Sequence, residues 1–126
     1  AGGGVPGETP IAGRFRVEAL GDGAFTGTGP FYRGARMNLG AMALLRIDDV
    51  HIAVASRKQQ SADQAMFRHL GAEPADFAVL ALKSSVHFRA DFGAMARRIL
   101  VVAAPGPNIA DPAQLPFTRL RRDLRP

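Results

Sequence analysis

The first part of the chain shows the alternation of apolar and polar residues that is typical of strands. Phe15, Val17 and Ala19 alternate with charged side chains, which is the period of a half-buried strand. The Gly-Asp-Gly stretch at residues 21–23 supplies the positive φ angles of a tight turn, and residues 24–29 follow as the returning strand. The pattern therefore predicts a first hairpin.

A second hairpin is predicted more clearly further along the chain. Residues 41–47 and 50–56 are apolar segments on either side of Asp48 and Asp49, two residues that tolerate turn geometry. The stretch between the two predicted hairpins, residues 29–40, is rich in glycine and indicates a loop with at most a short strand.

The period then changes from that of strands to that of helices. Ser61 and Gln64 have the spacing of a capping box, and apolar residues at helical spacing continue to Leu70. Gly71 can end this helix in a left-handed conformation. Residues 77–82 are continuously apolar, which is typical of a strand covered on both faces.

A second helix is predicted after Asp91, which can cap it, and its apolar stripe includes Phe92 and Ile99. Residues 99–104 follow as another buried strand. The hairpins are thus followed by a β-α-β-α-β segment. This order predicts an α/β (α+β) fold, in which a mixed β-sheet carries two short helices packed on it.

Length and composition favour one compact domain. A chain of 126 residues, of which 47% are hydrophobic and 21% charged, is large and apolar enough to bury a core. We assign residues 13–118 to this domain, residues 1–12 to a Gly/Pro-rich linker and residues 119–126 to a basic tail. The glycine-rich start also leads us to expect that the domain is part of a longer protein.

The positive charge of the chain suggests a class of partner that its other features disfavour. The formal net charge is +5, a surplus that can attract nucleic acid or an acidic membrane surface. Part of this charge lies in the tail, however, and the sequence has no Trp, one Tyr and no RNP-like or zinc-finger motif for reading bases. No apolar run approaches the roughly 18 residues that span a bilayer. We expect neither a nucleic-acid partner nor a membrane partner.

Residue spacing also disfavours a catalytic site contained within this chain. His51, His69 and His87 are far apart and there is no Cys, so a zinc site made by this chain alone is not expected. A nucleophilic serine paired with His87 is also not expected, because neither Ser84 nor Ser85 lies in the G-x-S-x-G turn that presents such a serine. We assign no metal ligand and no self-contained serine hydrolase.

Polar residues gather instead where two of the predicted strands end, after residues 50–55 and after residues 77–82. The carboxyl ends of parallel strands meet at one edge of a sheet, where they line binding crevices. If these two strands are parallel neighbours, one polar edge results. The alternative is two solvated loops whose hydroxyls cap the following helices. The predicted polar edge consists of Lys83, Ser84, Ser85, His87 and Arg89 with Ser56 and Arg57.

Four stretches of the sequence resemble a known family. They are Gly-Pro-x-Tyr-x-Gly, a Ser-Arg pair with a glutamine soon after it, a Phe-x-x-Leu-Gly helix end and Lys-Ser-Ser-x-His-Phe-Arg. In this chain they run from Gly29 to Gly34, from Ser56 to Gln60, from Phe67 to Gly71 and from Lys83 to Arg89. With these stretches, nearly all of residues 14–122 is similar to the C-terminal domain of the microcystinase C (MlrC-like) family, metallopeptidase family M81.

The resemblance implies a two-domain zinc metallopeptidase. In such proteins a longer N-terminal domain carries the zinc ligands and the catalytic machinery, and this smaller domain packs against it. No cofactor is therefore expected in this chain, and zinc is expected in the N-terminal catalytic domain that the chain does not include. The implied partners are that domain of the same polypeptide, a peptide substrate and a second copy of the chain in a homo-oligomer. The implied location is the bacterial cytoplasm.

The leading hypothesis is an accessory C-terminal domain that supplies polar groups at the edge of a zinc site on another domain. His87 and Lys83 are the candidate catalytic residues, because a cation and an imidazole can hold a substrate carboxylate or an oxyanion. The candidate substrate-binding residues are Ser84, Ser85, Arg89, Ser56 and Arg57. The alternative is a structural or interaction domain without a direct catalytic role. A third hypothesis, nucleic-acid binding through the basic tail, predicts an affinity that falls steeply with salt.

Overall fold

The structure is a computed structural model that describes residues 9–102 and 115–119. Most of the predicted linker and tail lies outside these residues, as do residues 103–104 of the last predicted strand. The domain boundaries therefore stay predictions. Among the described residues, no helix has the length and apolar character needed to cross a membrane.

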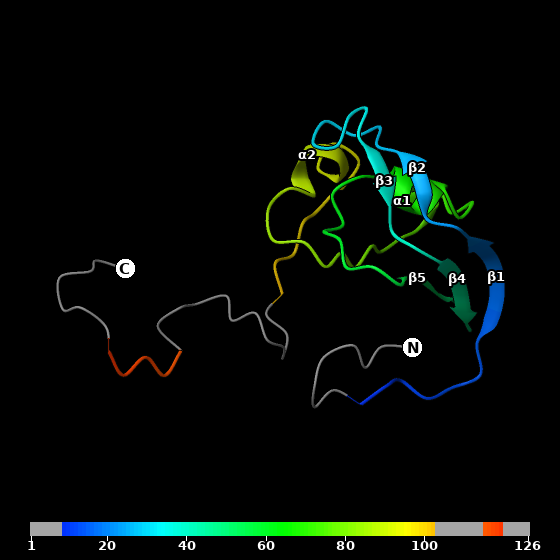
Figure 1. Cartoon of the computed structure of the whole chain (residues 1–126), viewed down its shortest axis with the longest axis horizontal. Helices are drawn as coiled ribbons and strands as arrows, with labels where there is room; N and C mark the ends of the chain where they lie inside the picture. The colour runs from blue at the N-terminus through cyan, green and yellow to red at the C-terminus, as the bar shows by residue number, and fades with distance from the viewer. Residues whose placement is uncertain (1–8, 103–114, 120–126) are drawn as a thin grey trace.

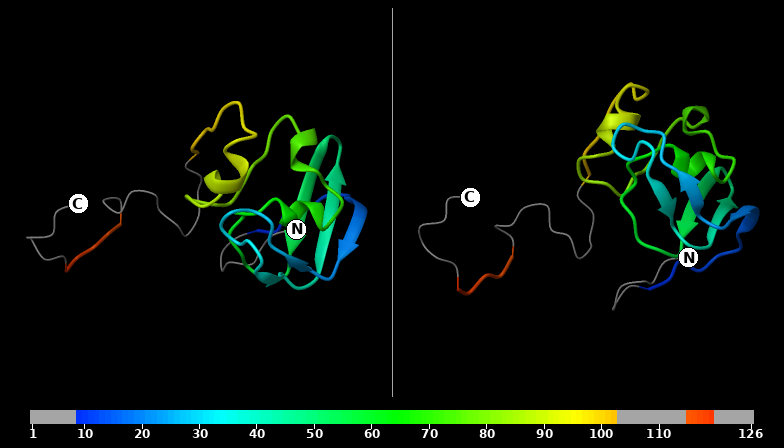
Figure 2. Two further views of the ribbon diagram at one scale, coloured as in Figure 1. Left: turned by 90° about the horizontal axis from the view of Figure 1, so that it is seen from above. Right: turned by 45° about the horizontal axis from the view of Figure 1, so that its top comes forward.

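The hairpin predicted at residues 41–56 is present. Its strands, β4 (Met42–Ile47) and β5 (Val50–Ala55), pair antiparallel around Asp48, whose φ of 49° makes the tight turn. On its other side β4 pairs with β1 (Arg16–Gly21). The result is a three-stranded sheet in the order β1-β4-β5, which Figures 1 and 2 show from three directions.

The first predicted hairpin is wrong, because its two strands belong to different sheets. β2 (Ala24–Thr26) pairs with β3 (Arg36–Asn38), the short strand expected in the loop that follows it. Gly23 has a φ of 74° and lies against the backbone of Gly40, so the chain turns away from the first sheet at this point. The glycine turn is present as predicted, but it joins two sheets.

A bulge changes the alternation that was expected in β1. The register of β1 against β4 shifts between Val17 and Ala19. Phe15 and Ala19 are half-buried as predicted, whereas Val17 is 54% exposed. The carboxylate of Glu18 lies 3.1 Å from Nε2 of His51 on β5. His51 is thus a residue of β5 that is paired with a carboxylate of β1.

The first helix is shorter than predicted. α1 (Ala65–Arg68) begins after the expected capping box, and the side chain of its N-cap residue Gln64 makes no capping bond. The buried carboxylate of Asp63 accepts the Ala65 N–H instead, at 2.8 Å. The end of the helical segment matches the prediction, because Gly71 has a φ of 77°.

Neither of the two continuous apolar segments forms a strand. Residues 77–82 follow a 3₁₀ turn, η1 (Pro74–Asp76), without regular structure, and Val79 is 82% exposed. Residues 99–102 are also irregular and exposed. A strand needs a neighbour that completes its hydrogen bonds, and neither segment pairs with a described strand. The predicted β-α-β-α-β segment is therefore wrong for the part of the chain that the structure describes.

The second helix is a single turn beside the loop that joins β2 to β3, as Figure 1 shows. α2 (Arg89–Phe92) contains Asp91, so this residue does not cap the helix as predicted. Phe92 is buried and meets the ring of Phe67 edge-on at a centroid distance of 6.0 Å. Ile99, the other end of the predicted stripe, lies beyond the helix.

The core lies between the three-stranded sheet and α1, with further side chains from the segments on either side. Its buried members are Leu39, Met42, Leu44, Met66, Leu70 and Ala72. The α+β class is confirmed. The described strands pair antiparallel in both sheets, however, so the predicted mixed sheet is not what they form.

An ion pair between the last residue of α1, Arg68, and Glu73 leads us to expect a loss of stability in acid. Arg68 donates from Nε and Nη2 to the two carboxylate oxygens of Glu73, at 2.7 and 2.9 Å. The hydrogen bond from Arg68 lowers the pKa of Glu73, so the pair stabilises the fold fully above the ordinary pKa of a glutamate and is lost as the pH falls through the lowered pKa. We expect Glu73→Gln to flatten the acid limb of the stability curve, measured by chemical denaturation at decreasing pH. Parallel curves for the two proteins would contradict this.

Candidate functional site

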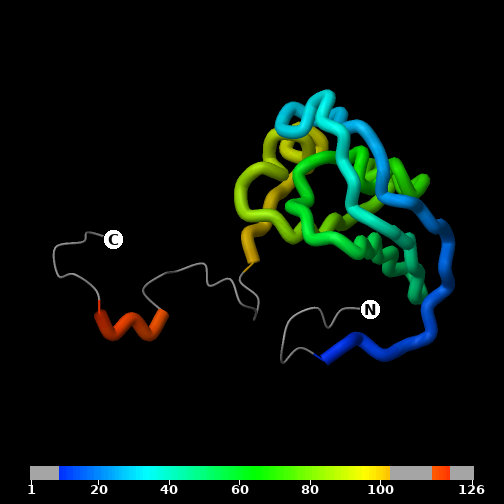
Figure 3. Tube along the Cα trace, viewed as in Figure 1, coloured from blue at the N-terminus to red at the C-terminus, as the bar shows by residue number. Residues whose placement is uncertain are grey.

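Two polar segments that are distant in the sequence lie side by side in the structure (Figure 3). The backbone N–H of Ser61 donates to the carbonyl of Lys83 at 3.5 Å, and Nε2 of Gln60 donates to Oγ of Ser84 at 3.0 Å. Gln60 and Ser61, which follow the predicted residues Ser56 and Arg57 in the chain, therefore contact the second part of the predicted polar edge. They do so without the parallel strands that were expected to deliver them.

These segments form the rim of a cavity of about 790 Å³ that has an apolar floor. Residues 57–61 and 83–85 make the rim, and side chains from β4, β5 and α1 make the floor together with Leu39. Met42 and Met66 on this floor are buried members of the core. The cavity thus connects the hydrophobic core to the polar edge.

Gln60 joins two of the predicted site residues. Its amide nitrogen donates to Ser84, and its amide oxygen lies 2.9 Å from Nδ1 of His87. Because an amide oxygen only accepts hydrogen bonds, Nδ1 carries the hydrogen in this contact. The His87 ring also stacks on Phe31, with centroids 4.0 Å apart. Two contacts therefore orient an exposed imidazole.

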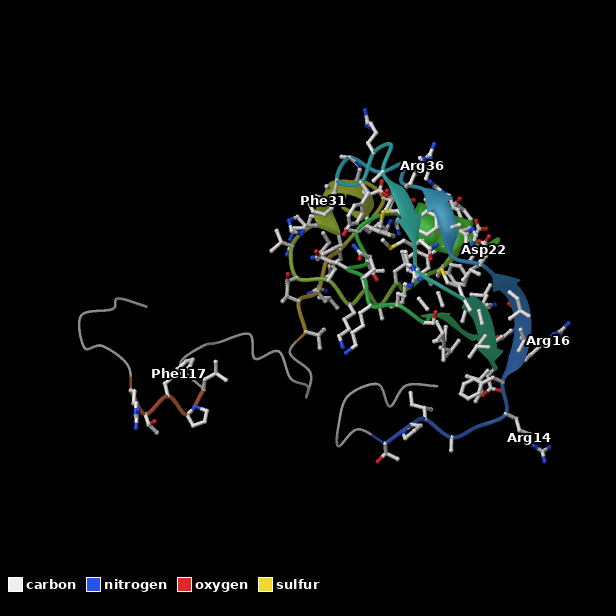
Figure 4. All side chains as sticks on the ribbon, viewed as in Figure 1. Arg14, Arg16, Asp22, Phe31, Arg36 and Phe117 are labelled. Carbon is white, nitrogen blue, oxygen red and sulfur yellow. The ribbon has the colours of Figure 1, made fainter. Side chains whose placement is uncertain are left out.

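The loop between β2 and β3 reaches the same edge through two aromatic residues. The hydroxyl of Tyr32 lies 2.6 Å from Nε2 of Gln59, and the rings of Phe31 and Tyr32 meet edge-on at 4.6 Å. Figure 4 shows Phe31 beside α2. The predicted site contains neither aromatic residue, nor Gln60. The signals for them in the sequence are the Gly-Pro-x-Tyr motif and the glutamine that follows Ser-Arg.

One carboxylate holds this loop against α1, and a second joins α2 to the start of α1. Asp63 is fully buried and accepts the backbone N–H groups of Gly29 and Ala65, both at 2.8 Å, and the hydroxyl of Thr28 at 3.3 Å. Asp91 of α2 accepts the N–H that precedes Ala65, at 2.6 Å. The position of Phe31 and Tyr32 therefore depends on the buried side chain of Asp63.

Arg57 is held by neutral acceptors. Its Nη1 donates to Oδ1 of Asn38 at 2.9 Å, and its backbone N–H donates to the carbonyl of Leu39 at 2.9 Å. The hydroxyl of Ser56 donates to the same carbonyl at 3.5 Å. Arg57 lines the cavity and Ser56 does not, so Ser56 supports the rim from behind.

The other predicted residues divide in the same way. Lys83, Ser84 and Ser85 line the cavity, whereas His87 and Arg89 do not. Arg89 begins α2, where its guanidinium carbon lies 5.0 Å from the centre of its neighbour's aromatic ring. The structure therefore brings His87 to the polar edge through Gln60, but it does not bring Arg89 to the cavity.

The rim of the cavity is positively charged. Arg57, Lys58 and Lys83 line it, and no acidic side chain of the part of the chain that the structure describes does so. Within residues 9–102 and 115–119, none of these three cations forms an ion pair. In the same residues, no group of three or more His, Asp or Glu side chains is arranged to hold a metal ion. The site is thus suited to binding an anion rather than a cation.

Comparison with known proteins decides the family. A family model described as the MlrC C-terminus matches residues 1–119. The chain belongs to this family. Over 72 residues it is 36% identical to Microcystinase C from Sphingomonas sp, in an alignment that covers 57% of this chain and 14% of that protein. No solved structure matches the chain.

The resemblance drawn from the sequence is thus confirmed at the level of the family. In this MlrC C-terminus domain, the Ser-Arg stretch with its glutamine and the Lys-Ser-Ser stretch are the segments that meet at the rim. Two of the four stretches that resemble the family therefore form the rim of the cavity, while β4, β5 and α1 supply its floor.

Proposed function

We propose that this domain completes the active site of a zinc-dependent MlrC-like peptidase. The zinc would be held by an N-terminal domain of the same polypeptide, as the resemblance to the family implies. The observation that carries the proposal is the positive charge of the rim, contributed by Arg57, Lys58 and Lys83, none of which forms an ion pair within the described residues. Peptide hydrolysis develops negative charge on the carbonyl oxygen, and cations near that oxygen stabilise the transition state.

The proposed roles follow from the chemistry of each side chain. Lys83 supplies an ammonium group to a substrate carboxylate or oxyanion, and the serine hydroxyls beside it donate hydrogen bonds. His87 presents Nε2, since Nδ1 is occupied by Gln60. Arg57 adds a guanidinium that Asn38 directs without neutralising it.

The test is a pair of substitutions in the complete protein that carries this domain. We expect Lys83→Ala and His87→Ala each to lower kcat/KM for linear peptides by about 30-fold, or about 2 kcal/mol, as for other lost charge-assisted hydrogen bonds. Product formation is followed by chromatography. Arg36→Ala is the matched control, because Arg36 is an exposed cation on β3 that points away from the body (Figure 4) and does not line the cavity. Unchanged turnover in both the Lys83→Ala and the His87→Ala variant would remove the rim and the imidazole beside it from the active site.

A structural or interaction domain is the second candidate, and the exposed apolar segments favour it. Val79, Leu100, Val101 and Val102 are between 68% and 82% exposed, in segments whose composition is that of buried strands. A neighbouring domain or a second copy of the chain would cover them. The same variants discriminate the two functions. Full turnover together with a lower Tm of the complete protein would favour the interaction role.

A further inference from the structure

We propose that the cavity binds the C-terminal residue of a peptide that ends in an apolar side chain. The rim takes the terminal carboxylate and the floor takes the side chain. This inference rests on the proposed function in choosing a peptide as the ligand, and it names the end of the substrate that this domain recognises. The argument comes from the contrast between the two halves of the cavity.

The floor is suited to an aliphatic or aromatic side chain. It is formed by Leu39, Met42, Met66 and Phe67 and by small alanines of β5. Methionine side chains are polarisable and adapt to ligands of different shape. A volume of about 790 Å³ lies within the range of ligand-binding pockets. The floor therefore offers apolar contact to more than one kind of residue.

The rim is suited to a carboxylate. A guanidinium and two ammonium groups, from Arg57, Lys58 and Lys83, border the apolar floor, and none of the described residues that line the cavity is acidic. Bonds from such donors to a carboxylate are about twice as strong as neutral hydrogen bonds. The Ser85 hydroxyl on the same rim can bond the peptide main chain. A ligand that satisfies both halves carries an anion one or two atoms away from an apolar group, as a peptide C-terminus does.

A methyl NMR titration of the chain tests this directly, since two of its four methionines line the floor. The probes are N-acetyl-Ala-Leu, its C-terminal amide, N-acetyl-Ala-Ala and hexanoate. We expect the acid to shift the methyl signals of Met42 and Met66 to saturation while Met95, which does not line the cavity, stays unchanged. The amide should bind at least about tenfold more weakly, because it lacks the charge. N-acetyl-Ala-Ala should also bind about tenfold more weakly, because it buries fewer methylene groups.

Variants of the rim complete the test. Lys83→Gln should weaken binding of N-acetyl-Ala-Leu about fivefold, and Arg36→Gln should leave it unchanged. Equal affinity for the acid and the amide, or no saturable shift at Met42 and Met66, would overturn the inference. Binding of hexanoate as tight as that of the peptide acid would overturn the commitment to a peptide.

The result is separable from that of the proposed function, because this titration needs neither zinc nor turnover. Selective binding of the peptide acid, with normal turnover of both Lys83→Ala and His87→Ala in the complete protein, would refute the proposed function and leave the site standing. Loss of turnover in these variants, without any binding of the acid, would refute the peptide site and leave the proposed function standing.

Discussion

Replacing Asp63 by Ala is expected to lower the free energy of unfolding by about 3 kcal/mol, the cost of breaking a buried charged network. Asp63 is fully buried and accepts hydrogen bonds from Gly29, Ala65 and Thr28. Without the carboxylate, two backbone N–H groups in the interior lose their partner. For a domain of this size the change corresponds to a fall in Tm of about 15 °C, which thermal unfolding followed by circular dichroism measures.

The matched control is Asp63→Asn. Its amide oxygen can accept a hydrogen bond from one of the two backbone N–H groups. We therefore expect the free energy of unfolding to fall by about half as much as in Asp63→Ala. Because Asp63 holds the loop that carries Phe31 against α1, Asp63→Ala should also broaden the aromatic signals of Phe31 and Tyr32. An unfolding free energy within 0.5 kcal/mol of the parent, the usual range for surface substitutions, would show that the network does not stabilise the fold.

Local signals predict the parts of the fold that depend on neighbours in the sequence. The hairpin of β4 and β5 follows from two apolar segments around Asp48, and the end of the first helical segment follows from Gly71. The segments 77–82 and 99–102 have the composition of buried strands, yet they are unpaired in the structure. Composition reports what a strand would bury, whereas pairing depends on a distant partner, which the sequence pattern does not reveal.

The site illustrates the same limit. The meeting of its two polar segments was predicted only for parallel neighbouring strands, and the described strands pair antiparallel. The contact depends on Gln60, whose amide bonds Ser84 and His87 from a position 24 and 27 residues away. A single glutamine gives no periodic signal, and neither does the stacking of Phe31 on His87. Long-range side-chain contacts of this kind need coordinates.

Gly23→Ala is expected to lower the free energy of unfolding by about 3 kcal/mol or more. The causes are the positive φ at this position and the overpacking of a Cβ against the backbone. Gly23 has a φ of 74°, and a Cβ there would overlap the carbonyl oxygen of Gly40 and lie 3.0 Å from the carbonyl carbon of Leu39. These are backbone atoms, which cannot move aside as a flexible side chain can. Chemical denaturation monitored by circular dichroism measures the loss.

Gly34→Ala is the control that separates the two causes. Gly34 has nearly the same φ, 77°, but a Cβ there meets nothing within 4 Å, so only the conformational cost of about 1 kcal/mol should appear. The difference between the two variants then measures the close approach of Gly23 to Leu39 and Gly40. Because Arg57 donates its backbone N–H to Leu39, a displaced backbone at that point should also weaken the rim, and Gly23→Ala should bind N-acetyl-Ala-Leu less tightly than Gly34→Ala. Equal losses of stability in the two variants would mean that the contact between the sheets tolerates a methyl group.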